Sequence, residues 1–376
     1  MTERLRQTPR SQLIPLGIAA AAILFALLYV IVIANPSTGV ADSWRTTNFG
    51  SAFDNPGAFV FTLLDALTFA GMLFIVASGF SLIFGLMRVV NMAHGSFYLL
   101  AGYIAYEVQQ RMTGQGGFAI AGMDVSTWEW VLPVLIAAAI VSVVGVVVQQ
   151  LLLRWNQGQD LRQALITIAV SLIVADQVIA HFPRHVPAGT KAFGGNAVGI
   201  GWPGWTNRLV DLHVWGVQYS LARLVMLALG AAVGVALWLW LYRTKTGMVI
   251  RAGVDDRQMT SALGINIQVT FAIAFAVGAA LVALGATVGT SQGNISQGQD
   301  GVWLLNSLVV VIIGGMGSLV GAVAGSVLFG LVTAFSTTYL PVSGPDCCTQ
   351  YSPVLTFVLM ALVLAFRPRG LFGREA

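Results

Sequence analysis

The sequence predicts an all-α integral membrane protein, a polytopic bundle of about eight to ten transmembrane helices with broken or re-entrant segments. Of the 376 residues, 57% are apolar and only 9% are charged, and the mean hydropathy is +0.81. Soluble domains carry about 25% charged residues, so this chain cannot cover a water-facing surface of its size. Long apolar runs recur along the chain, and no polar stretch is long enough to form a soluble domain. We therefore expect one membrane domain over residues 1–376.

Ten segments are candidates for these helices, since a spanning helix needs about 20 apolar residues. The segment 302–315 is short enough to be re-entrant rather than spanning. The first candidate follows three arginines, as in a signal peptide, but it is longer than a usual h-region and no A-x-A site closes it, so we expect a retained helix. The candidates are residues 13–34, 61–86, 93–109, 131–153, 163–181, 220–242, 267–290, 302–315, 318–340 and 352–366.

The basic residues alternate between loops. Most of the 19 lysines and arginines gather in residues 4–10, 154–162, 243–257 and 367–374. Cytoplasmic loops carry the excess of basic residues, so we expect both termini in the cytoplasm and an even number of helices, most simply ten. The loops 35–58, 182–218 and 341–351 then face outside. Trp202, Trp205, Trp215 and Trp303 fit an outer interfacial belt.

Glycine recurs at intervals of four residues in several apolar segments. Gly317, Gly321 and Gly325 form one such run, and Gly230 with Gly234 and Gly285 with Gly289 form others. This spacing places small residues on one helix face and predicts close packing of helices.

Few residues suit chemistry inside a membrane. Asp65 and Asp176 lie in apolar stretches, either as coupling carboxylates or as helix-packing or interfacial ones. No relay of carboxylates and histidines crosses the membrane, which argues against a proton-driven carrier.

Neither a metalloprotease nor a hydrolase motif is present, and the adjacent Cys347 and Cys348 offer neither a disulfide framework nor a metal site. The basic charge is spread among loops, so it does not indicate nucleic acid.

The chain also lacks a phosphate-binding loop. Such a loop needs Gly-Lys-Ser/Thr, and both lysines, Lys191 and Lys245, follow a threonine. If transport is driven by ATP, the ATPase is therefore another polypeptide.

Two apolar segments, 80–103 and 308–331, are interrupted by short glycine-rich or polar breaks. Interrupted segments in corresponding halves of a transporter indicate a substrate path. In the first break, Asn91 is placed to cap the following helix, whose start favours an anionic group such as a carboxylate. The alternative is that Asn91 only caps and that His94 only bonds to a neighbouring backbone. Gly95 and Ser96 stand beside them.

The polar loop 242–265 cannot span a membrane. Its middle part favours a short helix, in which Asp255 and Asp256 are flanked by Arg251 and Arg257. A surface helix with charges of both signs is suited to docking a cytoplasmic partner. A solvated loop is the alternative.

Four motifs in order carry a resemblance to a known family. They are NMAHGSFYLLAGY at 91–103, RTKTGMVIRAGVDDRQMTSALGI at 243–265, IIGGMGSLVGAVAGSVLFGL at 312–331 and FRPRGLFG at 366–373. Together they resemble the permeases of the branched-chain amino acid (LIV-type) family of ABC importers, which also includes urea and related permeases. The family-like core covers residues 60–373. The N-terminal helix and outer loop, 1–58, and the loop 182–218 carry no motif of the family.

The resemblance implies a multi-pass permease of the bacterial plasma (inner) membrane that is not itself an enzyme and holds no cofactor or metal. Its partners would be a second similar permease or a copy of itself, two cytoplasmic ATPase subunits that bind ATP and Mg²⁺, and an extracytoplasmic binding protein. The substrate path would include Asn91, His94, Gly95, Ser96, Asn306, Gly314, Gly315 and Gly317. The ATPase coupling region, in the loop 243–265, would include Arg251, Ala252, Asp255, Asp256, Leu263 and Gly264.

One departure leaves the substrate open. The family often has Lys-Ala-Phe before the glycine-rich segment, where this chain reads WLLNSLVV with Asn306. Branched-chain amino acids, urea, amides and aromatic acids all remain candidates. An ion-coupled carrier or channel and an integral membrane enzyme are the alternatives from other classes.

Overall fold

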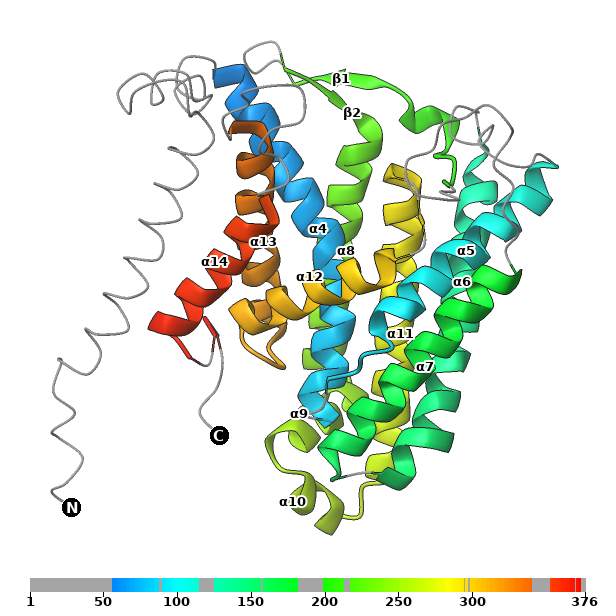
Figure 1. Cartoon of the computed structure of the whole chain (residues 1–376), viewed down its shortest axis with the longest axis vertical. Helices are drawn as coiled ribbons and strands as arrows, with labels where there is room; N and C mark the ends of the chain where they lie inside the picture. Colours follow the sequence, from blue (N-terminus) through cyan, green and yellow to red (C-terminus); the bar gives the residue numbers. More distant parts are fainter. Residues whose placement is uncertain are drawn as a thin grey trace, which may run out of the picture.

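The computed structural model describes residues 56–87, 90–114, 125–156, 158–181, 199–212, 217–293, 295–296, 298–339, 352–368 and 370–372. It is almost entirely helical (Figure 1). Within these residues, six helices are long and apolar enough to cross a membrane, and the all-α membrane fold is confirmed. They are Pro56–Met87, Thr127–Asn156, Asp160–Val178, Leu221–Arg243, Ile267–Gln292 and Leu319–Tyr339.

The elements follow the order expected from the apolar segments. The helices are α4 (Pro56–Met87), α5 (His94–Thr113), α6 (Thr127–Val147), α7 (Asp160–His181), α8 (Leu221–Arg243), α9 (Lys245–Asp255), α10 (Arg257–Ala262), α11 (Ile267–Gln292), α12 (Gln299–Gly314), α13 (Leu319–Tyr339) and α14 (Ser352–Phe366). A π-helical turn, Val148–Leu153, and 3-10 turns at Arg154–Asn156 and Gly204–Thr206 interrupt them. Strands β1 (Leu209–Asp211) and β2 (Gln218–Ser220) pair antiparallel before α8.

Nine of the ten expected helices are therefore found where the sequence predicts them. α12, with 16 residues, is about 24 Å long at 1.5 Å per residue, which is shorter than the apolar core of a bilayer. It lies obliquely across the bundle, whereas α8 and α11 run along the long axis (Figure 1). The expected helix at 13–34 lies outside the described residues, and the total of ten crossings stays a prediction.

α4 is the central helix of the bundle. It contacts α8, α9, α11, α12 and α13. Glycines allow these approaches: a Cβ built on Gly230 of α8 would lie 2.8 Å from the Cα of Gly71, and one on Gly79 would lie 2.5 Å from the carbonyl oxygen of Gly278 of α11. The close packing predicted from the glycine repeats is confirmed at Gly230 and again at Gly321 (below).

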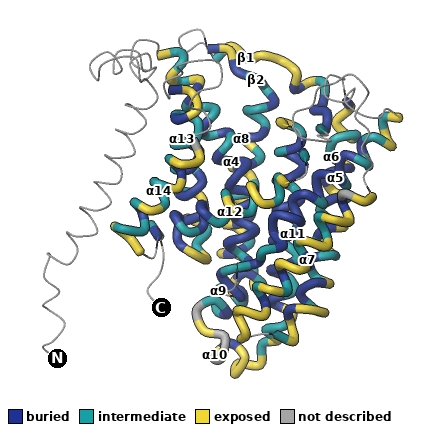
Figure 2. Tube along the Cα trace, viewed as in Figure 1, coloured by how far each residue is buried: buried dark blue, intermediate teal, exposed yellow. Residues whose placement is uncertain are grey.

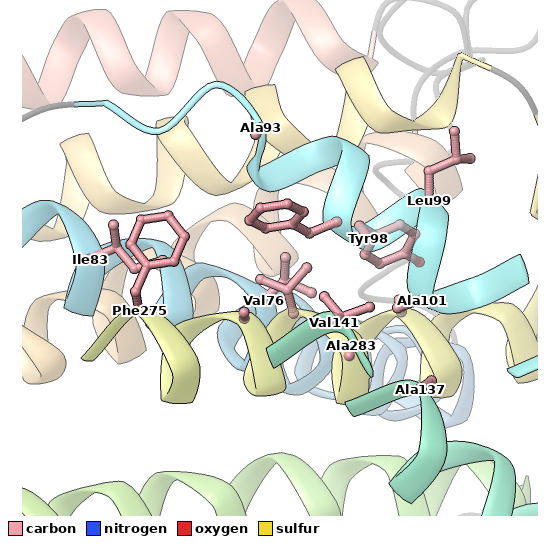
Figure 3. Close-up of a cluster of buried hydrophobic side chains, with 14 of the residues drawn as sticks. Val76, Ile83, Ala93, Tyr98, Leu99, Ala101, Ala137, Val141, Phe275 and Ala283 are labelled. Carbon is pink, nitrogen blue, oxygen red and sulfur yellow. The ribbon is translucent and has the colours of Figure 1, made fainter. Parts of the chain in front are cut away.

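The largest buried cluster joins α4, α5, α6 and α11. Val76, Val141 and Ala283 are fully buried there, and Phe275 packs its ring edge against Phe97 at 6.3 Å (Figure 3). Buried residues follow α4, α5 and α11, and exposed ones lie on outward faces such as that of α7 (Figure 2). The outward faces are apolar, as expected of surfaces that face lipid or another membrane subunit.

The polar ends of several helices are fixed by capping residues. Ser126 and Glu129 form a capping box at the start of α6, and the Asn266 side chain accepts from the first amides of α11. At opposite ends of the long axis lie the β1–β2 hairpin and the α9–α10 pair (Figure 1). The two ends therefore differ in structure, and each can serve a different partner.

Candidate substrate path and coupling surface

The break before α5 is held by its own polar groups and by α7. The Ala93 N–H donates to Asn91 Oδ1 at 3.1 Å, and the Met92 N–H donates to Thr167 Oγ1 at 3.2 Å. The expected cap was wrong in its position, because Ala93 occupies the N-cap and makes no side-chain bond there. Asn91 instead orders the turn that leads into the helix. Its buried Nδ2 has no hydrogen-bond partner among the described residues.

His94 is fully buried at the start of α5. Its Nε2 lies 3.1 Å from the carbonyl oxygen of Val76 and therefore carries the proton, and its ring meets Phe80 edge-on at 5.1 Å. The backbone bond that the sequence offered as an alternative is thus present. It leaves Nδ1, an acceptor in the neutral ring, without a partner in the described part of the chain. One buried donor and one buried acceptor thus stand close to this break.

Ser96 is not close to these unpaired polar atoms through its hydrogen bonds; it bonds to α7 instead. Its Oγ lies 2.6 Å from Ser171 Oγ and 3.2 Å from the Ser171 carbonyl oxygen, so it joins α5 to α7. We assign it to helix packing.

α5 and α12 interlock along a seam. A Cβ on Gly95 would collide with the carbonyl oxygen of Asp300 in α12, and one on Gly102 would collide with the side chain of Ile295 in the segment that leads into α12. Between these contacts the rings of Tyr98 and Trp303 stack, with centroids 4.5 Å apart and planes at 19°. The helix that follows the first break, α5, is therefore in direct contact with the helix that precedes the second break, α12, and Gly95 is needed for that approach.

Trp303 corrects the expected tryptophan belt. Trp303 is partly buried and stacks on Tyr98, whereas Trp202 is largely buried and stacks on Trp130 at 5.3 Å. Trp205 is about half exposed, as the belt requires. Trp215 lies outside the described residues.

The glycine-rich segment forms a tight turn between α12 and α13. A Cβ on Gly314 would collide with the carbonyl oxygen of Gly321, and Gly315 and Gly317 adopt positive φ of 106° and 78°. Ser318 starts α13, because its Oγ accepts from the Gly321 N–H at 3.0 Å. These glycines allow the close packing of α12 on α13 and the tight turn between them.

α12 carries polar side chains before this turn. Asn306 is half-buried, whereas Ser307 is fully buried and its hydroxyl has no hydrogen-bond partner within the described residues. Sequence reasoning chose Asn306 and missed Ser307. In the sequence, Ser307 stands out only as a single hydroxyl within an apolar run.

The C-terminal motif holds the end of α12. The N–H groups of Leu371 and Phe372 donate to the carbonyl oxygens of Ile313 and Gly314, both at 2.9 Å. Gly370 has φ 79° and lies against Gly315. The last carbonyls of a helix lack intrahelical partners, so this segment supplies the cap. The sequence marked the motif but not this role.

The loop after α8 folds into α9 and α10. α9 packs on α4, α8 and α11, with Ile250 buried. The Arg251 guanidinium lies 4.4 Å from the centre of the Tyr242 ring, and Ala252, one residue on, is half-buried. Asp255 ends α9. This arrangement fixes α9 to the bundle.

α10 projects beyond α9. The Met259 N–H donates to Asp256 Oδ1 at 3.0 Å, so Asp256 caps this helix. Gly264 ends it with φ 81°. Met248, Met259 and Leu263 are exposed by 62%, 62% and 74%, which leaves three large apolar side chains on the surface of this end.

The two carboxylates considered for ion coupling have different surroundings. Asp65 pairs with Arg223 and accepts from the Tyr219 hydroxyl at 2.8 Å, which ties α4 to α8 and to the hairpin. Asp176 is exposed on α7. No group of three or more histidine, cysteine or acidic side chains placed to hold a metal occurs in the described ranges.

These observations define a multi-pass α-helical membrane protein whose interior contains two broken segments and whose one end carries two short helices. The model of the family "Branched-chain amino acid transport system / permease component" matches residues 62–364. The chain belongs to this family, as its motifs indicated.

The chain is similar in sequence to known permeases over most of their length. The chain is 28% identical over 315 residues to the high-affinity branched-chain amino acid transport system permease protein BraD of Pseudomonas aeruginosa, covering 83% of this chain and 95% of that protein. It is 25% identical to LivH of Salmonella typhimurium, covering 84% and 96%. Among solved structures, PsaBC from Streptococcus pneumoniae is similar at a TM-score of 0.39 and 12% identity, covering 82% of this chain and 91% of that one.

Proposed function

We propose that this chain is the membrane-spanning subunit of an ATP-binding-cassette importer that moves branched-chain amino acids, or similar small carboxylated solutes, inward by alternating access. The observation that carries the proposal is the α9–α10 pair. It is anchored on the central helix α4 and exposes Met248, Met259 and Leu263 at one end of the bundle. Exposed apolar side chains on a structured projection favour a docking surface for a protein partner.

The partner at this surface is a pair of ATPase subunits. The chain has no Gly-Lys-Ser/Thr motif, so ATP and Mg²⁺ bind in those subunits. When they close on ATP, they push α9 and α10. α9 packs against α4 and α11, so the push reaches the centre of the membrane domain. Arg251, Ala252, Asp255, Asp256, Leu263 and Gly264 shape this surface.

The solute passes near the two broken segments. Asn91 Nδ2 offers a donor and His94 Nδ1 an acceptor, and the Ser307 hydroxyl offers both. The first two lie close to the start of α5, whose positive end favours a carboxylate. Gly95, Gly314, Gly315 and Gly317 let the surrounding helices approach one another, and half-buried Asn306 adds a polar group on α12.

The α9–α10 end faces the bacterial cytoplasm and the β1–β2 end faces outside, in line with the distribution of arginine and lysine. A binding protein delivers the solute at the β1–β2 end. A second permease, similar or identical, completes the path against the apolar outer faces. A urea, amide or aromatic-acid solute is the alternative within the same family, because the segment with Asn306 departs from the family pattern.

An ion-coupled carrier or channel has less support. It needs a coupling carboxylate in the membrane interior, and Asp65 is bound to Arg223 and Tyr219. The ion pair with Arg223 gives the Asp65 carboxylate a structural role.

Co-purification tests the proposal most directly. The tagged protein is extracted from its native membrane in mild detergent, and the proteins that accompany it are identified by mass spectrometry. We expect two ATPase subunits, and the reconstituted complex should take up leucine, isoleucine or valine only with ATP and a binding protein. A lone chain that transports without ATP would contradict the proposal.

A further inference from the structure

Trp303 contacts several groups of helices at once. Its ring stacks on Tyr98 of α5 and lies 6.5 Å from Phe69 of α4. It packs against all three buried clusters of the described chain: the one shared by α4, α5, α6 and α11, the one around α4, α12 and α13, and the one that contains Trp202 and Met226. A single aromatic ring thus contacts the helix groups of all three clusters.

The stack lies toward the β1–β2 end. Later residues of α5 lead to that end, because Gln109 bonds through its side chain to both backbone groups of Gly201, and Trp202 follows in the same cluster as Trp303. The other end of α12 leads toward α9, because its turn meets the last residues of α4 at Gly85.

The unpaired polar atoms lie on the inner side of this stack. His94 precedes Tyr98 by one helical turn on α5, and Ser307 follows Trp303 by one turn on α12. Both steps lead away from the β1–β2 end. A solute that enters from that end must therefore pass the two rings before it reaches these groups.

We propose that the Tyr98–Trp303 stack is the outer gate of the substrate path, closed in this structure, and that α5 and α12 separate at this point to admit the solute. The inference rests on the proposed transport function. Two flat rings in contact exclude water and solute, and their stacking and buried area stabilise the closed state. The gate takes no part in a reaction. It controls when the solute can reach the interior of the bundle.

Thiol accessibility tests the gate without requiring ATP or a substrate. Cys347 and Cys348 are first replaced by serine, and Ser307→Cys then provides a reporter one turn inside the gate. Right-side-out membrane vesicles are treated with a charged, membrane-impermeant methanethiosulfonate, and the rate of labelling is measured. We expect slow labelling with Trp303 present and a rise of about tenfold or more with Trp303→Ala, because removing the stack shifts the closed state toward the open one. Trp303→Phe, which keeps a stacked ring, should return the rate toward that of the parent.

Two controls separate a gate from general loosening. Ser326→Cys on α13 replaces a serine that is as deeply buried as Ser307 and bonds to the Val323 carbonyl oxygen of its own helix, and Trp128→Ala removes an exposed tryptophan of α6. The gate requires that Trp303→Ala accelerates labelling at position 307 and leaves labelling at position 326 slow, and that Trp128→Ala changes neither rate. Equal acceleration at both reporters, or no acceleration at position 307, overturns the proposal.

A second variant covers a failure of the first to fold. If Trp303→Ala does not reach the membrane, Tyr98→Leu removes the same stack and must give the same selective rise. Labelling does not depend on ATPase subunits, so failure of the importer assignment is recognised separately by co-purification.

Discussion

Gly85 of α4 and Gly317 of the α12–α13 turn lie back to back: a Cβ built on either one would lie 3.0 Å from the Cα of the other. The same added Cβ on Gly85 would lie 3.8 Å from Val254 of α9, and one on Gly253 would lie 3.5 Å from Leu86. α9 therefore touches the end of α4 where α4 touches the turn. A displacement of α9 is transmitted through these contacts to α12, on which Trp303 and Ser307 lie.

We predict that Gly85→Val uncouples ATP hydrolysis from uptake. The added side chain forces the turn away from α4, and overpacking of this kind costs about 1 to 3 kcal/mol, which corresponds to a loss of uptake of roughly fivefold to 150-fold if the cost falls on the moving step. ATPase subunits should still co-purify, because the exposed surface of α9 and α10 is unchanged. Uptake and ATP hydrolysis are measured in the same proteoliposomes. Gly301→Val is the matched control, since a Cβ at Gly301 meets no atom within 4 Å; equal loss in both variants would refute the role of Gly85.

The long helices were predictable because each depends on a local property. An apolar run of about 20 residues has few ways to satisfy its backbone in a membrane, and a helix is the one available within a single segment. Glycine repeats likewise predicted close approach, and Gly230 and Gly321 lie where helices nearly touch. Both signals are contained in a short stretch of sequence.

The candidate site was predicted less well because its contacts join distant segments. Asn91 was a reasonable cap by its residue type, yet it bonds within the turn before α5, and Thr167 of α7 also holds that turn, which no local pattern indicates. Tryptophan is a residue type typical of membrane interfaces, but Trp303 stacks on Tyr98, which lies far earlier in the chain. The capping of α12 by Leu371 and Phe372 uses backbone groups, which leave no side-chain signature.

Gly264 should be required for its backbone conformation and not for space. Its φ of 81° disfavours any residue with a Cβ, although no atom lies within 4 Å of that position. Gly264→Ala should therefore lower the stability of the α10–α11 turn by about 1 kcal/mol, while Gly264→Asn should cost less because asparagine tolerates this region. Limited proteolysis of the loop and retention of ATPase subunits measure the effect. Equal behaviour of the two variants would argue against a conformational cause.

The Tyr219 hydroxyl should make stability fall at alkaline pH. Burial, assisted by the Asp65 carboxylate, raises the pKa of Tyr219 to about 12 from its ordinary value of 10.0. The folded state thus keeps a proton that the unfolded chain loses, so the stabilisation is complete below about pH 10 and is lost as the pH rises toward about 12. Thermal unfolding in detergent is measured across this range. Tyr219→Phe should lose the bond to Asp65 and show a smaller alkaline decline, and an unchanged decline would assign it to other groups.

Asp65 and Asp176 should not be needed for energy coupling. Asp176→Asn changes an exposed side chain and should leave uptake intact. Asp65→Asn leaves Arg223 without its carboxylate and should reduce stability by about 1 to 2 kcal/mol, since the pair is only partly buried. Transport per folded complex should remain dependent on ATP in both variants. Loss of transport in well-folded Asp65→Asn, with restoration by glutamate, would instead favour an ion-coupled carrier.

The capping of α12 by the C-terminal segment should be separable from the rest of the C-terminus. Deleting residues 371–376 removes the two N–H groups that bond to Ile313 and Gly314, whereas deleting residues 373–376 keeps both. Two backbone hydrogen bonds contribute about 1 kcal/mol each, and the freed carbonyls must find other partners, so the longer deletion should lower the thermal midpoint and reduce uptake. The shorter deletion should match the full chain in both measurements. Because α12 carries Trp303 and Ser307, the longer deletion should also accelerate labelling of a cysteine at position 307. Unchanged labelling would mean that the turn with Gly315 and Gly317 holds α12 without help from this segment.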